Sequence, residues 1–206
     1  MSLKPALYLL LAATALPVPA RAVDLSAAPA VKPIAVFAPP QPSWAGAYLS
    51  GFGLYGANIA DTTPNMHGPG VGGTVGYNVQ LGSGVVGLRA DLAWLNMSNT
   101  ATLAALGSST INYLGDVDLL LGLPLGDGRT LAYGVGGFAY GGVTPVVGAN
   151  ITPIGWNVGA GLAHQLLGNW QTYIEGDFFA LGSNAPGAST PPYNVFQAKA
   201  GLTYRF

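Results

Sequence analysis

The chain has 206 residues, of which half are hydrophobic and 7 % are charged, and its net charge is −1. A typical soluble domain carries roughly 25 % charged residues, so this composition argues against an ordinary water-soluble domain. The small net charge excludes an electrostatic surface for nucleic acid. The absence of cysteine excludes disulfides and thiolate metal sites.

Residues 1–22 have the features of a secretory signal peptide. Lys4 supplies a positive charge, residues 7–16 (LYLLLAATAL) form a short apolar core, and Ala20-Arg21-Ala22 forms a cleavage site. The next segment, residues 23–43, contains five prolines and is predicted to be an extended Pro/Ala-rich periplasmic linker. Beyond residue 22, no apolar run reaches the roughly 20 residues that a transmembrane helix needs.

Residues 44–206 consist of eight short runs in which apolar residues alternate with polar or small ones. Each run has the length of a tilted strand that crosses a membrane. Short glycine-containing turns alternate with longer connections, so we predict an all-β fold, an eight-stranded antiparallel up-and-down transmembrane β-barrel with both termini in the periplasm and longer loops outside. The predicted strands are residues 45–56, 70–81, 85–96, 110–123, 129–141, 154–166, 170–181 and 195–206.

Nearly all charged residues of these runs lie on the parity opposite the aliphatic residues. A soluble barrel could show the same alternation with its charges outside. Because this chain has too few charges to solvate an outer wall, we expect the aliphatic face to meet lipid and the charged face to line the lumen. Lipid also requires every backbone group to be paired, so the sheet must close. The predicted lumen charges are Arg89, Asp91, Asp116, Asp118, Glu175, Asp177, Lys199 and Arg205.

The interior of an eight-stranded barrel is narrow enough for side chains to fill it. Because buried charges must be paired, we expect these acids and bases to form a salt-bridge network that plugs the lumen. A narrow, slightly cation-preferring water path is the alternative. We also place Phe138 and Tyr140 inside the barrel, and most other aromatic residues, including Tyr48 and Tyr133, in girdles at the two membrane interfaces.

The sequence predicts no catalytic, cofactor or metal site. Residues 68–73 match GxGxxG, but a dinucleotide site needs a strand before this motif and a helix after it. His67 in the first long connection and His164 near a turn are isolated from each other, and His164 has no serine nearby. We therefore expect that the protein is not an enzyme.

Five segments, taken in order, resemble those of a known family: WAGAYLSGFGLYGAN, GGTVGYNVQ, GVVGLRADLAW, GWNVGAGLAHQLLGNWQTYIEGDFF and AKAGLTYRF. They are similar to the small outer-membrane β-barrel proteins of alphaproteobacteria, the Brucella-type major outer-membrane proteins, which are also labelled porin-family or opacity-like. The resemblance implies insertion by the barrel-assembly machinery, with Leu202, Tyr204 and Phe206 as the assembly signal. It also implies a role in envelope integrity, with some members tethered to peptidoglycan and some binding haem. The low charge and short loops of this chain depart from the family pattern.

The leading hypothesis is therefore a structural, non-enzymatic outer-membrane barrel without a cofactor. The expected partners are outer-membrane lipids and lipopolysaccharide, the barrel-assembly machinery, and peptidoglycan or a protein of the envelope. A narrow porin-like pore for small solutes or ions is the alternative. A third hypothesis is an accessory subunit of a larger outer-membrane or surface complex, because uncharged exposed loops often mark contact surfaces.

Overall fold

The computed structural model of the chain describes residues 42–59, 66–99, 110–144, 149–182 and 193–206. The predicted signal peptide, most of the predicted linker and parts of the four longer connections lie outside these residues. Within the described residues, no helix is long and apolar enough to cross a membrane.

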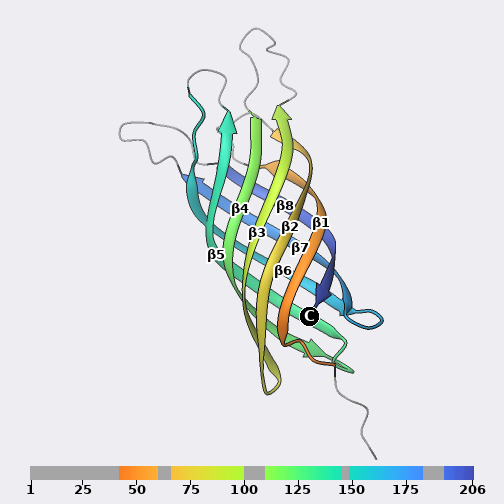
Figure 1. Cartoon of the computed structure of the whole chain (residues 1–206). Helices are drawn as coiled ribbons and strands as arrows, with labels where there is room; N and C mark the ends of the chain where they lie inside the picture. The colour runs from red at the N-terminus through yellow and green to blue at the C-terminus, as the bar shows by residue number, and fades with distance from the viewer. Residues whose placement is uncertain (1–41, 60–65, 100–109, 145–148, 183–192) are drawn as a thin grey trace, which may run out of the picture. The chain divides into compact units, whose positions relative to one another are not determined.

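The described residues form eight antiparallel strands that close into a barrel, as Figure 1 shows. Each strand pairs with the next one along the chain, and β8 pairs with β1, so the sheet has no open edge. This closure satisfies the backbone groups that would otherwise face lipid, and it confirms the predicted fold class. The strands are β1 Gly46–Asn58, β2 Met66–Leu81, β3 Gly84–Asn99, β4 Thr110–Leu125, β5 Thr130–Thr144, β6 Ile154–Gln165, β7 Trp170–Gly182 and β8 Tyr193–Arg205.

Three tight turns, between β2 and β3, β4 and β5, and β6 and β7, gather at one end of the barrel, which we call the turn end. Gly82 and Gly168 have φ angles of 60° and 64° in the first and third of these turns. Glycine adopts this left-handed conformation without a steric penalty. The strand ends that lead into the longer connections lie at the opposite end of the barrel, which we call the loop end.

Side chains alternate between the lumen and the outer wall along the strands. In β3, Arg89 and Asp91 are buried, whereas Leu88 and Trp94 are 62 % and 59 % exposed. All eight predicted lumen charges are buried in the same way. The outer wall is therefore aliphatic and aromatic, as a surface in contact with hydrocarbon should be.

Most strands extend beyond the predicted ranges, and β2 and β3 do so by the most. β2 begins at Met66 and β3 continues to Asn99, so His67 lies in a strand and not in a loop. The sequence Gly68-Pro69-Gly70 resembles a turn, but Pro69 lies opposite Tyr55 of β1 in a regular antiparallel register. The register of β2 with β3 omits Gly68 and Pro69, which agrees with the tendency of proline to occupy irregular positions in sheets.

Four aromatic residues lie on the opposite side of the wall from the one predicted. Phe138 is 50 % exposed and Tyr140 shares its outward parity, whereas Tyr48 and Tyr133 are buried in the lumen. Small residues occupy both parities of β5, so the sequence pattern did not identify its inner face. The register with β4 does so, because Phe138 pairs with the outward-facing Val117.

Candidate functional site

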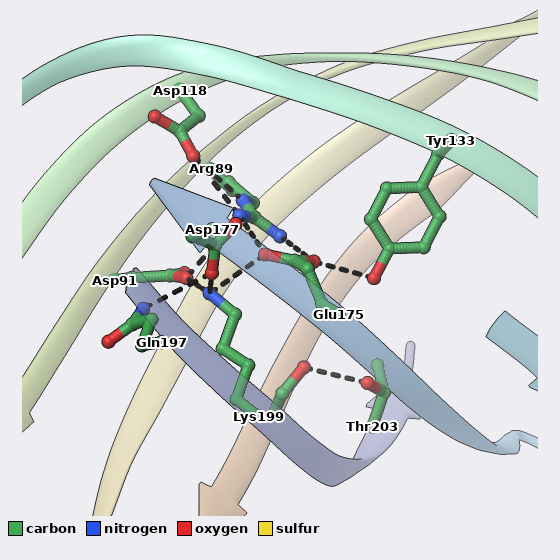
Figure 2. Close-up of polar contacts among 10 residues, drawn as sticks. Arg89, Asp91, Asp118, Tyr133, Glu175, Asp177, Gln197, Lys199 and Thr203 are labelled. Carbon is green, nitrogen blue, oxygen red and sulfur yellow. Dashed lines mark hydrogen bonds and ion pairs between the residues drawn. The ribbon is translucent and has the colours of Figure 1, made fainter. Parts of the chain in front are cut away.

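Two pairs of neighbouring strands bring the lumen charges together. Arg89 of β3 lies opposite Asp118 of β4, and Asp91 lies opposite Asp116. On the other side of the barrel, Glu175 of β7 lies opposite Lys199 of β8. Long side chains from these two sides meet across the narrow lumen, as Figure 2 shows.

Arg89 is bound through both of its terminal nitrogens to one carboxylate. Its Nη1 and Nη2 donate to Oε2 and Oε1 of Glu175 at 2.7 and 2.5 Å. Nη2 and Nε also donate to Oδ2 of Asp118 at 3.1 and 3.3 Å. The bidentate arrangement holds β3 against β7 with a defined geometry, because the planar guanidinium matches the carboxylate.

Lys199 is surrounded by three carboxylates. Its Nζ lies 2.5 Å from Oδ2 of Asp91, 2.8 Å from Oε1 of Glu175 and 3.2 Å from Oδ2 of Asp177. Gln197 donates from Nε2 to Oδ2 of Asp177 at 3.1 Å. We call the group formed by Arg89, Asp91, Asp118, Glu175, Asp177 and Lys199 the charge cluster (Figure 2).

Tyr133 adds a neutral donor to the charge cluster. Its hydroxyl donates to Oε2 of Glu175 at 2.6 Å, so Glu175 is bonded by side chains from β3, β5 and β8. Burial of a carboxylate requires such compensation, because an unpaired charge in the barrel interior is costly.

Asp116 is buried beside the charge cluster but differs from its members. It is 3 % exposed, and among the residues that the structure describes it forms no ion pair. Its register partner across the ladder is another carboxylate, Asp91. The five acids of the lumen therefore exceed the two cations, Arg89 and Lys199, that lie among them.

Arg205, the eighth predicted lumen charge, lies outside the charge cluster. It donates from Nη1 to the carbonyl oxygen of Trp44 and from Nη2 to Oε1 of Gln171 at 3.3 Å. Its guanidinium carbon lies 5.7 Å from the centre of the Trp44 ring and 5.8 Å from that of Tyr48. Aromatic faces and carbonyl oxygens therefore replace carboxylates as its partners.

Trp44 covers the turn end of the lumen. It is 1 % exposed, its backbone N–H donates to Oε1 of Gln80 at 3.0 Å, and its Nε1–H donates to the carbonyl oxygen of Gly128 at 2.8 Å. Ser43 is held next to it, because Nε2 of Gln165 donates to the Ser43 carbonyl oxygen at 3.0 Å. The residues just before β1 thus cross the mouth of the barrel.

An apolar layer fills the lumen near the loop end. Its side chains come from β2, β3, β4, β7 and β8, and their exposed fractions are all 0 %. The charge cluster therefore lies between this layer and Trp44. The layer consists of Met66, Met97, Ile111, Phe179, Leu181 and Val195.

Sequence reasoning missed Trp44 and Tyr133 as members of the lumen. The alternation in β8 placed Gln197 on the lumen face with Lys199, but it did not identify Gln197 as a partner of Asp177. Trp44 precedes the first strand, so no strand periodicity applies to it.

The two histidines lie on different parts of the outer wall. His67 stacks on Tyr55, with Nδ1 at 2.8 Å from the tyrosine hydroxyl. His164 lies on β6 near the turn end, and its Nδ1 is 3.0 Å from the Thr130 hydroxyl. Within the described part of the chain, no group of three or more histidine and acidic side chains is arranged to hold a metal ion.

The three residues of the predicted assembly signal face outward at the turn end. Leu202, Tyr204 and Phe206 are 52 %, 36 % and 74 % exposed. Tyr204 makes edge contacts with Trp170 and Phe206, with ring centres 5.2 and 5.1 Å apart. The Phe206 N–H donates to the Ala47 carbonyl oxygen at 3.0 Å, which joins the C-terminus to β1.

Comparison with known proteins gives a family and several relatives. A family model described as outer membrane protein beta-barrel domain matches residues 8–206. The 22 kDa outer membrane protein of Rhizobium leguminosarum bv. viciae is 32 % identical over 176 residues, which cover 81 % of this chain and 80 % of that protein. The 31 kDa outer-membrane immunogenic protein of Brucella melitensis biotype 1 is 28 % identical over 159 residues, 66 % of this chain and 66 % of that protein's length.

Solved structures show the same fold at low sequence identity. Ail, the attachment invasion locus protein of Yersinia pestis, has a TM-score of 0.52 and 14 % identity, and the match covers 79 % of this chain and 99 % of that one. Neisserial surface protein A has a TM-score of 0.53 and 11 % identity, with 78 % and 97 % covered. These similarities concern the fold alone.

Proposed function

The chain belongs to the outer-membrane β-barrel protein family, as its resemblance to the small barrels of alphaproteobacteria predicted, and from that premise we propose that it is a structural barrel with a closed lumen. In this role it supports the integrity of the outer membrane, performs no catalysis and conducts no ions. The observation that carries this proposal is the pairing of the buried charges in the lumen. Both cations of the charge cluster, Arg89 and Lys199, form ion pairs with carboxylates of the cluster.

The two ends of the lumen support the closed state. Water entering from the loop end would have to pass the buried apolar layer that contains Met97 and Phe179. Water entering from the turn end would have to displace Trp44, which is hydrogen-bonded to Gly128. A conducting path would need both barriers and the bidentate pair between Arg89 and Glu175 to open together.

Conductance of the purified full-length protein in planar lipid bilayers tests the closed lumen. We expect no resolved openings from the wild type. A variant that combines Trp44→Ala, Met97→Ala and Arg89→Ala weakens both barriers and removes the bidentate pair, so it is expected to admit ions and shows that the assay can detect a passage. Stable cation-selective openings of the wild type would instead support the narrow pore.

We place the turn end and both termini in the periplasm and the longer loops outside, in contact with lipids and lipopolysaccharide. In this orientation the partner of the predicted linker would be peptidoglycan or a protein of the envelope. Deletion of the gene should make cells more sensitive to detergent, and the full chain should restore resistance. A chain that lacks residues 23–43 separates the two parts of the protein. If it reaches the membrane but does not restore detergent resistance, the linker is needed for envelope integrity. If it restores resistance fully, the barrel alone is sufficient.

We assign assembly to the exposed aromatic end of β8, which the barrel-assembly machinery would read. Removal of Phe206 should lower the amount of folded protein in the outer membrane, whereas Phe206→Tyr keeps an aromatic ring and should preserve it. Folded protein is measured by its shifted migration in unheated gel samples. Equal amounts of folded protein from the truncated and full chains would refute this assignment.

A further inference from the structure

Beside Trp44, a small cavity of about 40 Å³ lies at the turn end of the barrel. This volume accommodates about one or two water molecules. Its wall is partly apolar, with Leu120 and Leu131, and partly polar, with hydroxyl and amide side chains, aromatic rings, Arg89 and Arg205. Among the residues that the structure describes, no carboxylate lines it.

The two arginines of this cavity differ in whether acidic side chains neutralise their charge. The guanidinium of Arg89 is already bound by Glu175 and Asp118. Arg205 is 9 % exposed, and its Nε–H has no hydrogen-bond partner among the described residues. A buried cation requires a counter-charge, and the rings of Trp44 and Tyr48 supply only part of it.

Further donors lie on the wall of the cavity. The buried Tyr173 hydroxyl lies beside the Thr74 side chain, but no partner among the described residues meets hydrogen-bond geometry with it. The hydroxyls of Ser50 and Thr203 are 2.7 Å apart and share one hydrogen, so the second hydrogen of this pair remains available. The cavity therefore combines an uncompensated guanidinium with neutral donors.

We propose that this cavity is a binding site for one small monatomic anion of the size of chloride, with Arg205 as its counter-charge. The small volume favours a monatomic anion over a polyatomic one such as phosphate, and water would leave the charge of Arg205 without a counter-ion. Trp44 lines the cavity and is itself 1 % exposed, so a bound anion lies beside a side chain that is shielded from solvent. This inference goes beyond the proposed structural role and does not depend on it.

Salt-dependent thermal unfolding tests the site. The full chain is refolded in detergent in sodium chloride, bromide or gluconate at equal ionic strength and pH. We expect the unfolding midpoint to rise by a few degrees, saturably, in chloride and bromide relative to gluconate. The variant Arg205→Met should lose this dependence. Arg129→Met, which changes an arginine with a 58 % exposed side chain in the β4–β5 turn, should keep it.

Crystals grown in bromide provide a direct readout. We expect an anomalous peak within hydrogen-bond distance of Nε of Arg205. Should Arg205→Met fail to fold, Tyr173→Phe removes a single hydroxyl from the cavity wall and should weaken the chloride dependence. The same midpoint in all three salts, an empty anomalous map, or an unchanged chloride dependence in Arg205→Met would each show that water fills the cavity and would overturn the proposal.

Discussion

Lys199 and Arg205 lie on the same face of β8, and both are buried, but they are stabilised in different ways. Lys199 contacts three carboxylates within 3.2 Å. Arg205 contacts a backbone carbonyl, an amide oxygen and two aromatic rings. The comparison shows that the barrel interior has two electrostatic regions, an acid-rich centre and a turn end in which the cation has no acidic partner among the described residues.

The largest effect is expected where removal of a cation leaves acids unpaired. Lys199→Met keeps the approximate length of the side chain but leaves Asp91, Glu175 and Asp177 without their shared ammonium. Breaking a buried ion pair in this way costs about 3–5 kcal/mol. The free energy of unfolding, measured by urea titration of protein folded into lipid vesicles, should fall by that amount.

A smaller effect is expected for the matched change at the turn end. Arg205→Met leaves no carboxylate unpaired, but the Trp44 carbonyl and the Gln171 amide oxygen lose a donor. Unsatisfied buried acceptors of this kind cost about 1–2 kcal/mol. The same titration in gluconate buffer separates this loss from any effect of a bound halide. A loss as large as that of Lys199→Met would mean that the two regions are not distinct.

The smallest effect is expected at Asp116, the acid without an ion pair. Asp116→Asn keeps the shape of the side chain and removes the repulsion from Asp91 directly opposite. Because like charges opposite each other destabilise a sheet, stability should stay the same or rise by up to about 1 kcal/mol. If the variant instead loses several kcal/mol, Asp116 is an essential member of the charge balance.

Several features of the lumen followed from the sequence because side chains in a strand alternate with period two. This alternation assigned Arg89, Glu175 and Lys199 to one face without any knowledge of their partners. It failed in β5, where small residues on both parities left Phe138 on the wrong side. It also could not include Trp44, which lies outside the strands.

The sequence by itself determined the number of strands, the inner and outer faces of most of them though not of β5, and the presence of an excess of acids in the lumen, since each depends on local periodicity and composition. The tertiary structure decided which charges meet. Closure of β8 on β1 sets the height of each residue in the barrel, and height separates Lys199 from Arg205 although their parity is the same. The tertiary structure also places Trp44 at the turn end, where it lines the cavity beside Arg205.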